Sequence, residues 1–250
     1  MSALAIAAGV TVVIGAALQA ATGFGFGLVA APLLYAAAGP PEAVGLLVVL
    51  GLEVNLLTLG TERRRPQPLM PETALLLAWA VPGLALGILA LRSLDATTLQ
   101  IALTVGVFAT LAVRRYATRH SAEGSHPRLP RGALPVTGVT SGALSVSTST
   151  AGPPLVLYLL ARGARPGQTR DTLTANFLGL VPLAVLALAI SGTTSAIPDP
   201  LVLAALVPLT LLGHLAGRPV FARLAEGRYE LALTVVLVAT ALGGLVTVLV

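Results

Sequence analysis

The fold is decided by a glycine-rich stretch, "ATGFGFGLVAAP" (residues 21–32), inside an apolar run that covers residues 3–38. Three glycines, Gly23, Gly25 and Gly27, fall within five positions. A glycine in a helix interior costs about 1 kcal/mol relative to alanine, so this spacing predicts a break in the helix. Such a break is expensive in a membrane, where no water bonds the freed backbone groups. The stretch therefore indicates a site rather than a simple span.

The composition indicates an integral membrane protein of the all-α class. The chain has 250 residues, 56% hydrophobic and 10% charged, with a mean hydropathy of +0.91, whereas soluble domains carry about 25% charged residues. Several apolar stretches reach the ~20 residues that a membrane-crossing helix needs. A β-barrel is excluded because its strands alternate apolar and polar residues, and these stretches do not.

The charged residues exclude several other classes. All fifteen basic residues are arginine and lie mainly between apolar segments, so the net charge of +5 is read as an orientation signal and no nucleic-acid partner is expected. The absence of cysteine excludes disulfides and thiol chemistry. The N-terminus lacks the basic residues of a signal peptide, so it is interpreted as the first membrane segment.

The chain divides into two groups of five apolar segments. Residues 1–113 form the first transmembrane repeat, residues 114–131 a cytoplasmic linker and residues 132–250 the second repeat. The expected segments are residues 3–20, 24–38, 41–60, 71–91, 97–113, 133–147, 151–161, 171–191, 199–217 and 229–250. Segments 24–38 and 151–161 are short, so re-entrant hairpins and full crossings both remain open.

The two groups resemble each other in sequence. "VPGLALGILALR" (81–92) aligns with "VPLTLLGHLAGR" (207–218), and an offset of 127 pairs Gly25 with Gly152. Because each repeat has an odd number of segments, the second repeat is expected to run inverted relative to the first, as in many secondary transporters.

The arginines predict the orientation in the membrane. If each segment or hairpin reverses direction, only Arg92 lies on one side, and fourteen arginines lie on the other. Arginine-rich loops stay cytoplasmic, so we expect a multi-pass protein of the bacterial inner membrane with both termini outside. The fourteen are Arg63, Arg64, Arg65, Arg114, Arg115, Arg119, Arg128, Arg131, Arg162, Arg165, Arg170, Arg218, Arg223 and Arg228.

A second break is expected at the equivalent position of the second repeat, in "SGALSVSTSTAGPPLVLYLL" (141–160). Proline ends a helix because it lacks a donor and clashes with the preceding turn. A helix that restarts after a break presents free N–H groups and a positive dipole end, which together form an anion site. The candidate substrate-binding residues are Gln19, Thr22, Gly23, Phe24, Gly25, Phe26, Gly27, Ser145, Ser147, Thr148, Ser149, Thr150, Gly152, Pro153 and Asn176. The alternative is that these small residues only allow close helix packing.

Three further polar residues inside apolar segments are candidates for coupling or gating. Glu53 is a candidate carrier of a coupling proton, since ionisable groups inside a membrane are costly and often functional. Asn55 and His214 accompany it. A structural hydrogen-bonding role remains the alternative for each.

At these breaks the chain resembles the TauE/SafE family, also called the sulfite exporter or toluenesulfonate uptake permease family. The motifs that carry the resemblance are "GFGFGLVAAPLL" in the first repeat and "STSTAGPPLVLYLL" in the second, with "GPPLVLYLL" the most specific part. Phe26 and Leu46 depart from the usual family pattern. The resemblance implies transport of sulfur-containing oxyanions or organosulfonates, with small carboxylates as an alternative.

Three functional hypotheses follow. The first is a secondary carrier of a small anion that works by alternating access, without a cofactor or metal, with the anion and membrane lipid as partners and a homodimer left open. The second is an intramembrane enzyme, which would need clustered acid, base or metal ligands. The third is a membrane subunit that does not transport.

Overall fold

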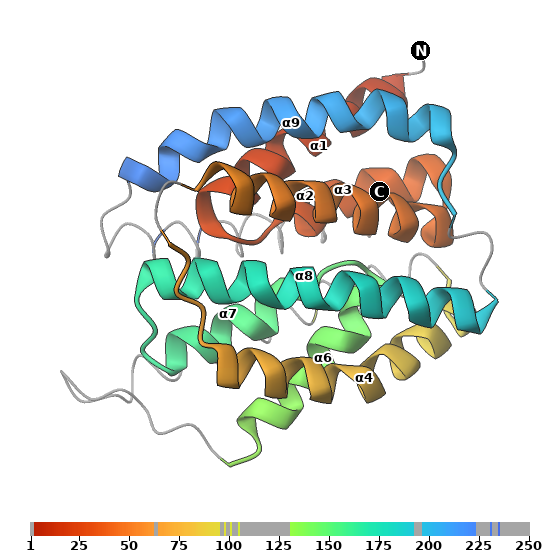
Figure 1. Cartoon of the computed structure of the whole chain (residues 1–250). Helices are drawn as coiled ribbons and strands as arrows, with labels where there is room; N and C mark the ends of the chain where they lie inside the picture. Colours follow the sequence, from red (N-terminus) through yellow and green to blue (C-terminus); the bar gives the residue numbers. More distant parts are fainter. Residues whose placement is uncertain are drawn as a thin grey trace.

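The computed structural model describes residues 3–62, 65–95, 131–192 and 197–223, together with the single positions 98, 101, 105, 231 and 235. Within these residues the secondary structure is entirely helical (Figure 1), which confirms the expected all-α class. The expected segments at 97–113 and 229–250 and the linker at 114–131 fall outside the described residues, apart from isolated positions.

The described helices follow the expected segments closely. Their bounds are α1 (Ala3–Thr22), α2 (Phe26–Ala38), α3 (Pro40–Thr61), α4 (Met70–Ser93), α6 (Ala133–Ser147), α7 (Gly152–Ala161), α8 (Pro166–Ser191) and α9 (Pro200–Arg223). Five of them, α1, α3, α4, α8 and α9, are long and apolar enough to cross a membrane, whereas α2 and α7 are shorter apolar helices.

The outward faces of the long helices are apolar. Exposed large hydrophobic side chains include Trp79 and Leu89 on α4 and Leu201 and Leu212 on α9. A soluble protein rarely exposes so much contiguous apolar surface, so these faces are the surfaces that contact lipid in a multi-pass membrane protein.

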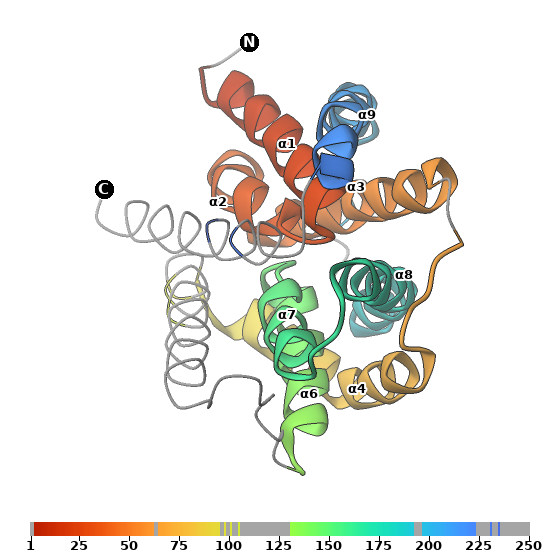
Figure 2. The ribbon, with the colours of Figure 1, turned by 90° about the vertical axis from the view of Figure 1, so that its left-hand side faces the viewer.

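The helices pack as two halves whose membership differs from that of the two repeats expected from the sequence (Figures 1 and 2). Half A contains α1, α2, α3 and α9, and half B contains α4, α6, α7 and α8. Thus α4 packs mainly on α6, and α9 packs mainly on α1. In Figure 1, α4 and α8 run from left to right, and α3 and α9 run from right to left.

Glycines on α4 and α9 allow these two helices to pack closely on α6 and α1. A Cβ atom added at Gly83 would lie 2.1 Å from the Val139 carbonyl oxygen of α6. One added at Gly213 would lie 2.3 Å from the Val13 carbonyl oxygen of α1. Real Cβ atoms do not approach so closely, so only glycine permits these helix crossings. The pattern repeats one turn later, at Gly87 on α4 and at Gly217 on α9.

The helix α8 begins earlier than the sequence predicts. It starts at Pro166 instead of residue 171, with proline in its first turn, where a missing N–H costs nothing. Its polar first turns are buried because they bond the segment before α4. The Asp171 carboxylate accepts from the Gln67 backbone N–H at 2.7 Å, and the Thr172 hydroxyl accepts from that of Leu69 at 3.0 Å.

Candidate functional site

The first helix break lies where the glycines predict it. Gly23 has φ +88° and Gly25 has φ +110°, a backbone region that side chains rarely adopt. Gly25 is the N-cap residue of α2. Between the two glycines, Phe24 is fully buried. The glycines therefore end α1 and start α2 within four residues.

The second break separates α6 from α7 and uses different residues. Thr148 is the C-cap of α6, and Ser149 has φ +54°, which is unusual for a residue other than glycine. The helix resumes at Gly152, with proline in its first turn. Hydroxyl side chains here replace the glycines of the first break.

The two breaks are in direct contact with each other. A Cβ atom added at Gly27 would lie 2.1 Å from the Ser149 carbonyl oxygen, so the start of α2 packs directly on the second break. In the reverse direction, Gly152 packs on the Phe24 ring, which a Cβ would approach to 2.9 Å. Neither break therefore faces lipid.

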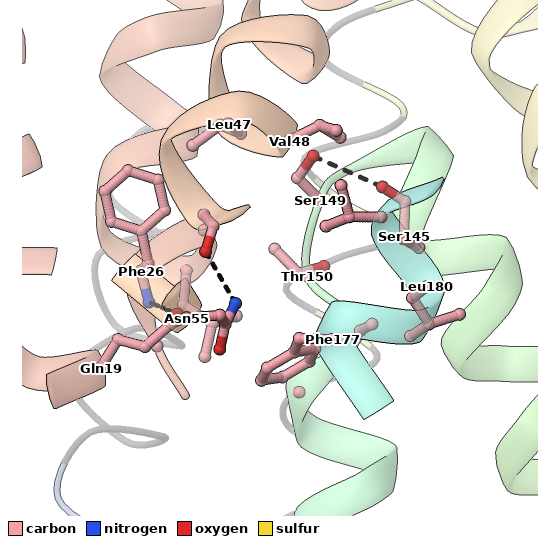
Figure 3. A pocket seen from close by; sticks show the side chains of 17 residues that line it. Gln19, Phe26, Leu47, Val48, Asn55, Ser145, Ser149, Thr150, Phe177 and Leu180 are labelled. Carbon is pink, nitrogen blue, oxygen red and sulfur yellow. Dashed lines mark hydrogen bonds between the residues drawn. The ribbon is translucent and has the colours of Figure 1, made fainter. Parts of the chain in front are cut away.

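A cavity of about 70 Å³ lies at this junction. A single water needs only ~10–15 Å³ of such volume, so the cavity is large enough for a molecule of several heavy atoms. Figure 3 shows polar groups from Gln19, Asn55, Ser145 and Thr150 around it. Its remaining lining is backbone and apolar. The lining residues are Gln19, Gly25, Phe26, Gly27, Leu28, Leu47, Val48, Gly51, Asn55, Ser145, Ser149, Thr150, Ala151, Gly152, Phe177, Leu180 and Val181.

The structure brings about half of the candidate binding residues to this cavity. Those that line it are Gln19, Gly25, Phe26, Gly27, Ser145, Ser149, Thr150 and Gly152. Those that lie outside the lining are Thr22, Gly23, Phe24, Ser147, Thr148, Pro153 and Asn176. Asn176 is buried between α8 and α4, where its amide donates to the Thr172 carbonyl at 2.9 Å and to the Thr73 hydroxyl at 3.5 Å.

Several hydroxyls outside the cavity bond the ends of the broken helices. Thr22 donates to the Leu18 carbonyl or the Phe24 carbonyl, both at 2.8 Å. Ser147 donates to the Ala143 carbonyl at 2.8 Å. The Thr148 and Thr150 hydroxyls lie 2.6 Å apart. Thr22 and Ser147 thus bond backbone carbonyls close to the helix ends.

The two restarted helices do not present equal sets of donors. At α2, the Phe26 N–H donates to the Gln19 side-chain oxygen at 3.2 Å. At α7, Pro153 and Pro154 occupy the second and third helical positions and have no N–H. The start of α7 therefore offers fewer free N–H groups than a helix start without proline, but it keeps the positive dipole end and the N–H of Gly152.

The candidate coupling residues lie in three different places. Asn55 lines the cavity, and its amide donates to the Gly51 carbonyl at 2.7 Å. Glu53 lies on the other side of α3, because residues two positions apart are about 200° apart around a helix. His214 is fully buried beside the end of α3, with Nε2 3.1 Å from the Thr61 hydroxyl.

Sequence reasoning missed the apolar part of the lining. Leu47, Val48 and Gly51 of α3 and Phe177, Leu180 and Val181 of α8 complete the cavity. Their spacing of three and four residues is the usual signal of any buried helix face. Nothing in that spacing separates a residue that lines a cavity from one that packs in a core.

The chemistry of the lining is that of binding. Among the described residues, no group of three or more histidine, aspartate or glutamate side chains could hold a metal ion. The described arginines are also absent from the lining. The cavity offers hydroxyls, carboxamides and a helix start, surrounded by apolar side chains and two phenylalanine rings.

A multi-pass helical protein with broken helices that meet at an internal cavity has the architecture of a membrane transporter. The family model of the sulfite exporter TauE/SafE matches residues 7–243, nearly the whole chain. The chain belongs to this family of membrane transporters. It matches no curated protein and no solved structure.

Proposed function

We propose that the protein is a secondary transporter of small sulfur-containing anions such as sulfite, thiosulfate or organosulfonates. The anion binds in the cavity between the two helix breaks and reaches either side of the membrane by alternating access. The observation that carries this proposal is the contact between the breaks, at Gly27 with Ser149 and at Gly152 with Phe24, next to a cavity that both breaks line.

The chemistry of the cavity suits an anion that must also leave. The starts of α2 and α7 contribute positive dipole ends. Ser145, Ser149 and Thr150 contribute hydroxyls, which can donate to the oxygens of a small oxyanion. An arginine would bind such an anion by paired, charge-assisted hydrogen bonds, and its absence from the lining favours release.

The arrangement of the helices supports alternating access between inverted repeats. The sequence repeats pair α3 with α8 and α4 with α9, and the members of each pair run in opposite directions in Figure 1. The glycine contacts of α4 with α6 are repeated by those of α9 with α1. Inverted repeats of this kind allow an inward-facing and an outward-facing state that are related by a pseudo-two-fold axis in the membrane plane.

The arginine distribution favours a bacterial inner-membrane location, with the end of the bundle that carries Arg170 and Arg218 in the cytoplasm. We propose proton coupling through Glu53. One carboxylate oxygen of Glu53, Oε2, is buried without a hydrogen-bond partner among the described residues, and the side chain lies within the span of α3. Glu53→Gln is then expected to abolish uptake driven by a pH gradient and to retain anion exchange.

The test is anion flux into proteoliposomes that contain the purified protein. The panel contains sulfite, thiosulfate, a short organosulfonate and a carboxylate of the same size as the organosulfonate. Saturable flux of the sulfur anions, with little flux of the carboxylate, supports the proposal. Flux of the carboxylate alone would replace the proposed substrate class, and flux of none of the four would refute the transport of small anions.

A further inference from the structure

The contacts between half A and half B are unequal on the two sides of the cavity. On α3 the lining residues run from Leu47 to Asn55. Val44 precedes them and Glu62 follows them, and each takes part in a contact with half B. Any motion that opens the cavity to one end must break the contacts at that end.

At one end the contact is a buried arginine. Arg170 on α8 has an exposed fraction of 3% and forms an ion pair with Glu62 at the end of α3. Its second terminal nitrogen donates to the Ala20 carbonyl in the last turn of α1 at 3.0 Å. A Cβ added at Gly23 would lie 3.0 Å from Arg170 Cγ, so the residue that follows α1 packs directly on this side chain.

At the other end the contacts are neutral. The Tyr35 hydroxyl on α2 donates to the Ser147 carbonyl in the last turn of α6 at 3.0 Å, and the Ser149 hydroxyl lies 3.5 Å from the Val44 carbonyl. Ser147 is the residue equivalent to Ala20 at the repeat offset of 127. The two accepting carbonyls are therefore equivalent, whereas their donors differ, because Ala43 stands at the position equivalent to Arg170.

We propose that Arg170 and Glu62 form a gate that holds halves A and B together at their end of the cavity, and that Tyr35 holds the other end more weakly. This inference rests on the proposed transport cycle. The arginine joins α8 to two helices of half A, including the turn of α1 that carries the cavity residue Gln19. Opening toward the Arg170 end must separate a charged pair. Among the described residues, the contacts between the halves at the Tyr35 end are neutral hydrogen bonds. The resting protein is therefore closed at the Arg170 end.

The gate is testable because the natural chain has no cysteine. Val181→Cys places a thiol in the cavity lining without altering a proposed binding group. Its reaction with a membrane-impermeant maleimide is measured from each side of proteoliposomes. Gln67→Cys, in the exposed loop before α4, marks the Arg170 end, and the exposed Ile197→Cys marks the opposite end.

Glu62→Gln is expected to raise labelling of the cavity thiol from the Arg170 end about tenfold, since removing one partner of a buried ion pair is strongly destabilising. Tyr35→Phe is expected to raise labelling from the other end by a smaller factor. The matched control is Glu72→Gln, which removes an exposed pair with Arg162 within half B at the same end. This control is expected to leave labelling from both ends unchanged.

Equal labelling of the cavity thiol in Glu62→Gln and Glu72→Gln would overturn the proposal. An equal rise in labelling from both ends in Glu62→Gln would also overturn it, because it indicates a general loss of packing between the halves. Where Glu62→Gln does not fold, Arg170→Lys is read in the same way, because lysine keeps the charge but cannot bond Glu62 and Ala20 as a planar fork. Protection of the thiol by sulfite tests the proposed function separately. If sulfite protects the thiol but Glu62→Gln does not raise labelling selectively from the Arg170 end, the gate alone is refuted. If labelling rises selectively from that end but sulfite neither protects the thiol nor is transported, only the anion site is refuted.

Discussion

Ser145 offers a direct test of anion binding, because the same helix carries a matched control. Ser145 on α6 lines the cavity, whereas Ser141 lies one turn earlier, outside the lining. The Ser141 hydroxyl oxygen is buried without a hydrogen-bond partner among the described residues. Replacing either serine by alanine removes one hydroxyl from one helix, so the two variants differ mainly in their distance from the proposed anion.

A hydrogen bond to a charged group contributes about 1.5–3 kcal/mol, and each 1.4 kcal/mol corresponds to about tenfold in affinity. Ser145→Ala is therefore expected to raise the KM for sulfite by about tenfold or more. Ser141→Ala removes a buried polar atom without a described partner, so it is expected to leave KM unchanged and to preserve or slightly raise thermal stability.

The assay is the initial rate of sulfite uptake into proteoliposomes over a range of concentrations, with the melting temperature of each purified variant in detergent as a check on folding. The reasoning is refuted if Ser145→Ala transports sulfite with the KM of the natural protein. It is equally refuted if Ser141→Ala and Ser145→Ala raise KM by the same factor, because the effect would then come from packing in α6.

Two further substitutions have defined outcomes. Gln19→Glu keeps the acceptor for the Phe26 N–H but adds a negative charge to the cavity. Repulsion between this charge and a bound anion at ~4 Å reaches about 4 kcal/mol at an effective dielectric constant of 20, so anion flux is expected to fall more than about 100-fold with the melting temperature unchanged. Retained flux would contradict the anion site. Gly87→Ala places a Cβ 2.3 Å from the Ala143 carbonyl oxygen, and overpacking costs about 1–3 kcal/mol, so the melting temperature is expected to fall. In the control Gly60→Ala the added Cβ has no atom within 4 Å, and alanine gains helix propensity of about 1 kcal/mol, so this variant is expected to be more stable. Equal changes in the melting temperatures of the two variants would contradict the close packing of α4 on α6.

The sequence predicts the helices and both breaks because their signals are local. Glycines at 23 and 25 and the prolines at 153 and 154 act on their own backbone, and apolar length alone identifies a membrane span. The five long spans and the short α2 and α7 follow from these rules. The early start of α8 was missed because Asp171 and Thr172 are buried only through bonds to a distant segment.

The site itself is predictable only in part. The second break contains five hydroxyl residues, and the pattern gives no sign of which of them face the cavity. Ser147 and Thr148 bond backbone carbonyls of their own helix, whereas Ser145 and Thr150 line the cavity. Which side chains face the cavity depends on the orientation of each helix about its own axis, and this orientation is set by tertiary packing. Likewise, Arg170 reads as a loop residue near the cytoplasm, and its pairing with Glu62 depends on tertiary contacts over 108 positions.

The exchange of α4 and α9 between the halves bears on how the chain is assembled during synthesis. The glycine face of α4 is synthesised before α6, its partner, and α1 is synthesised long before α9, with which it packs. Insertion of the first helices into the bilayer and acquisition of the native arrangement are thus separate events, because the second requires α9.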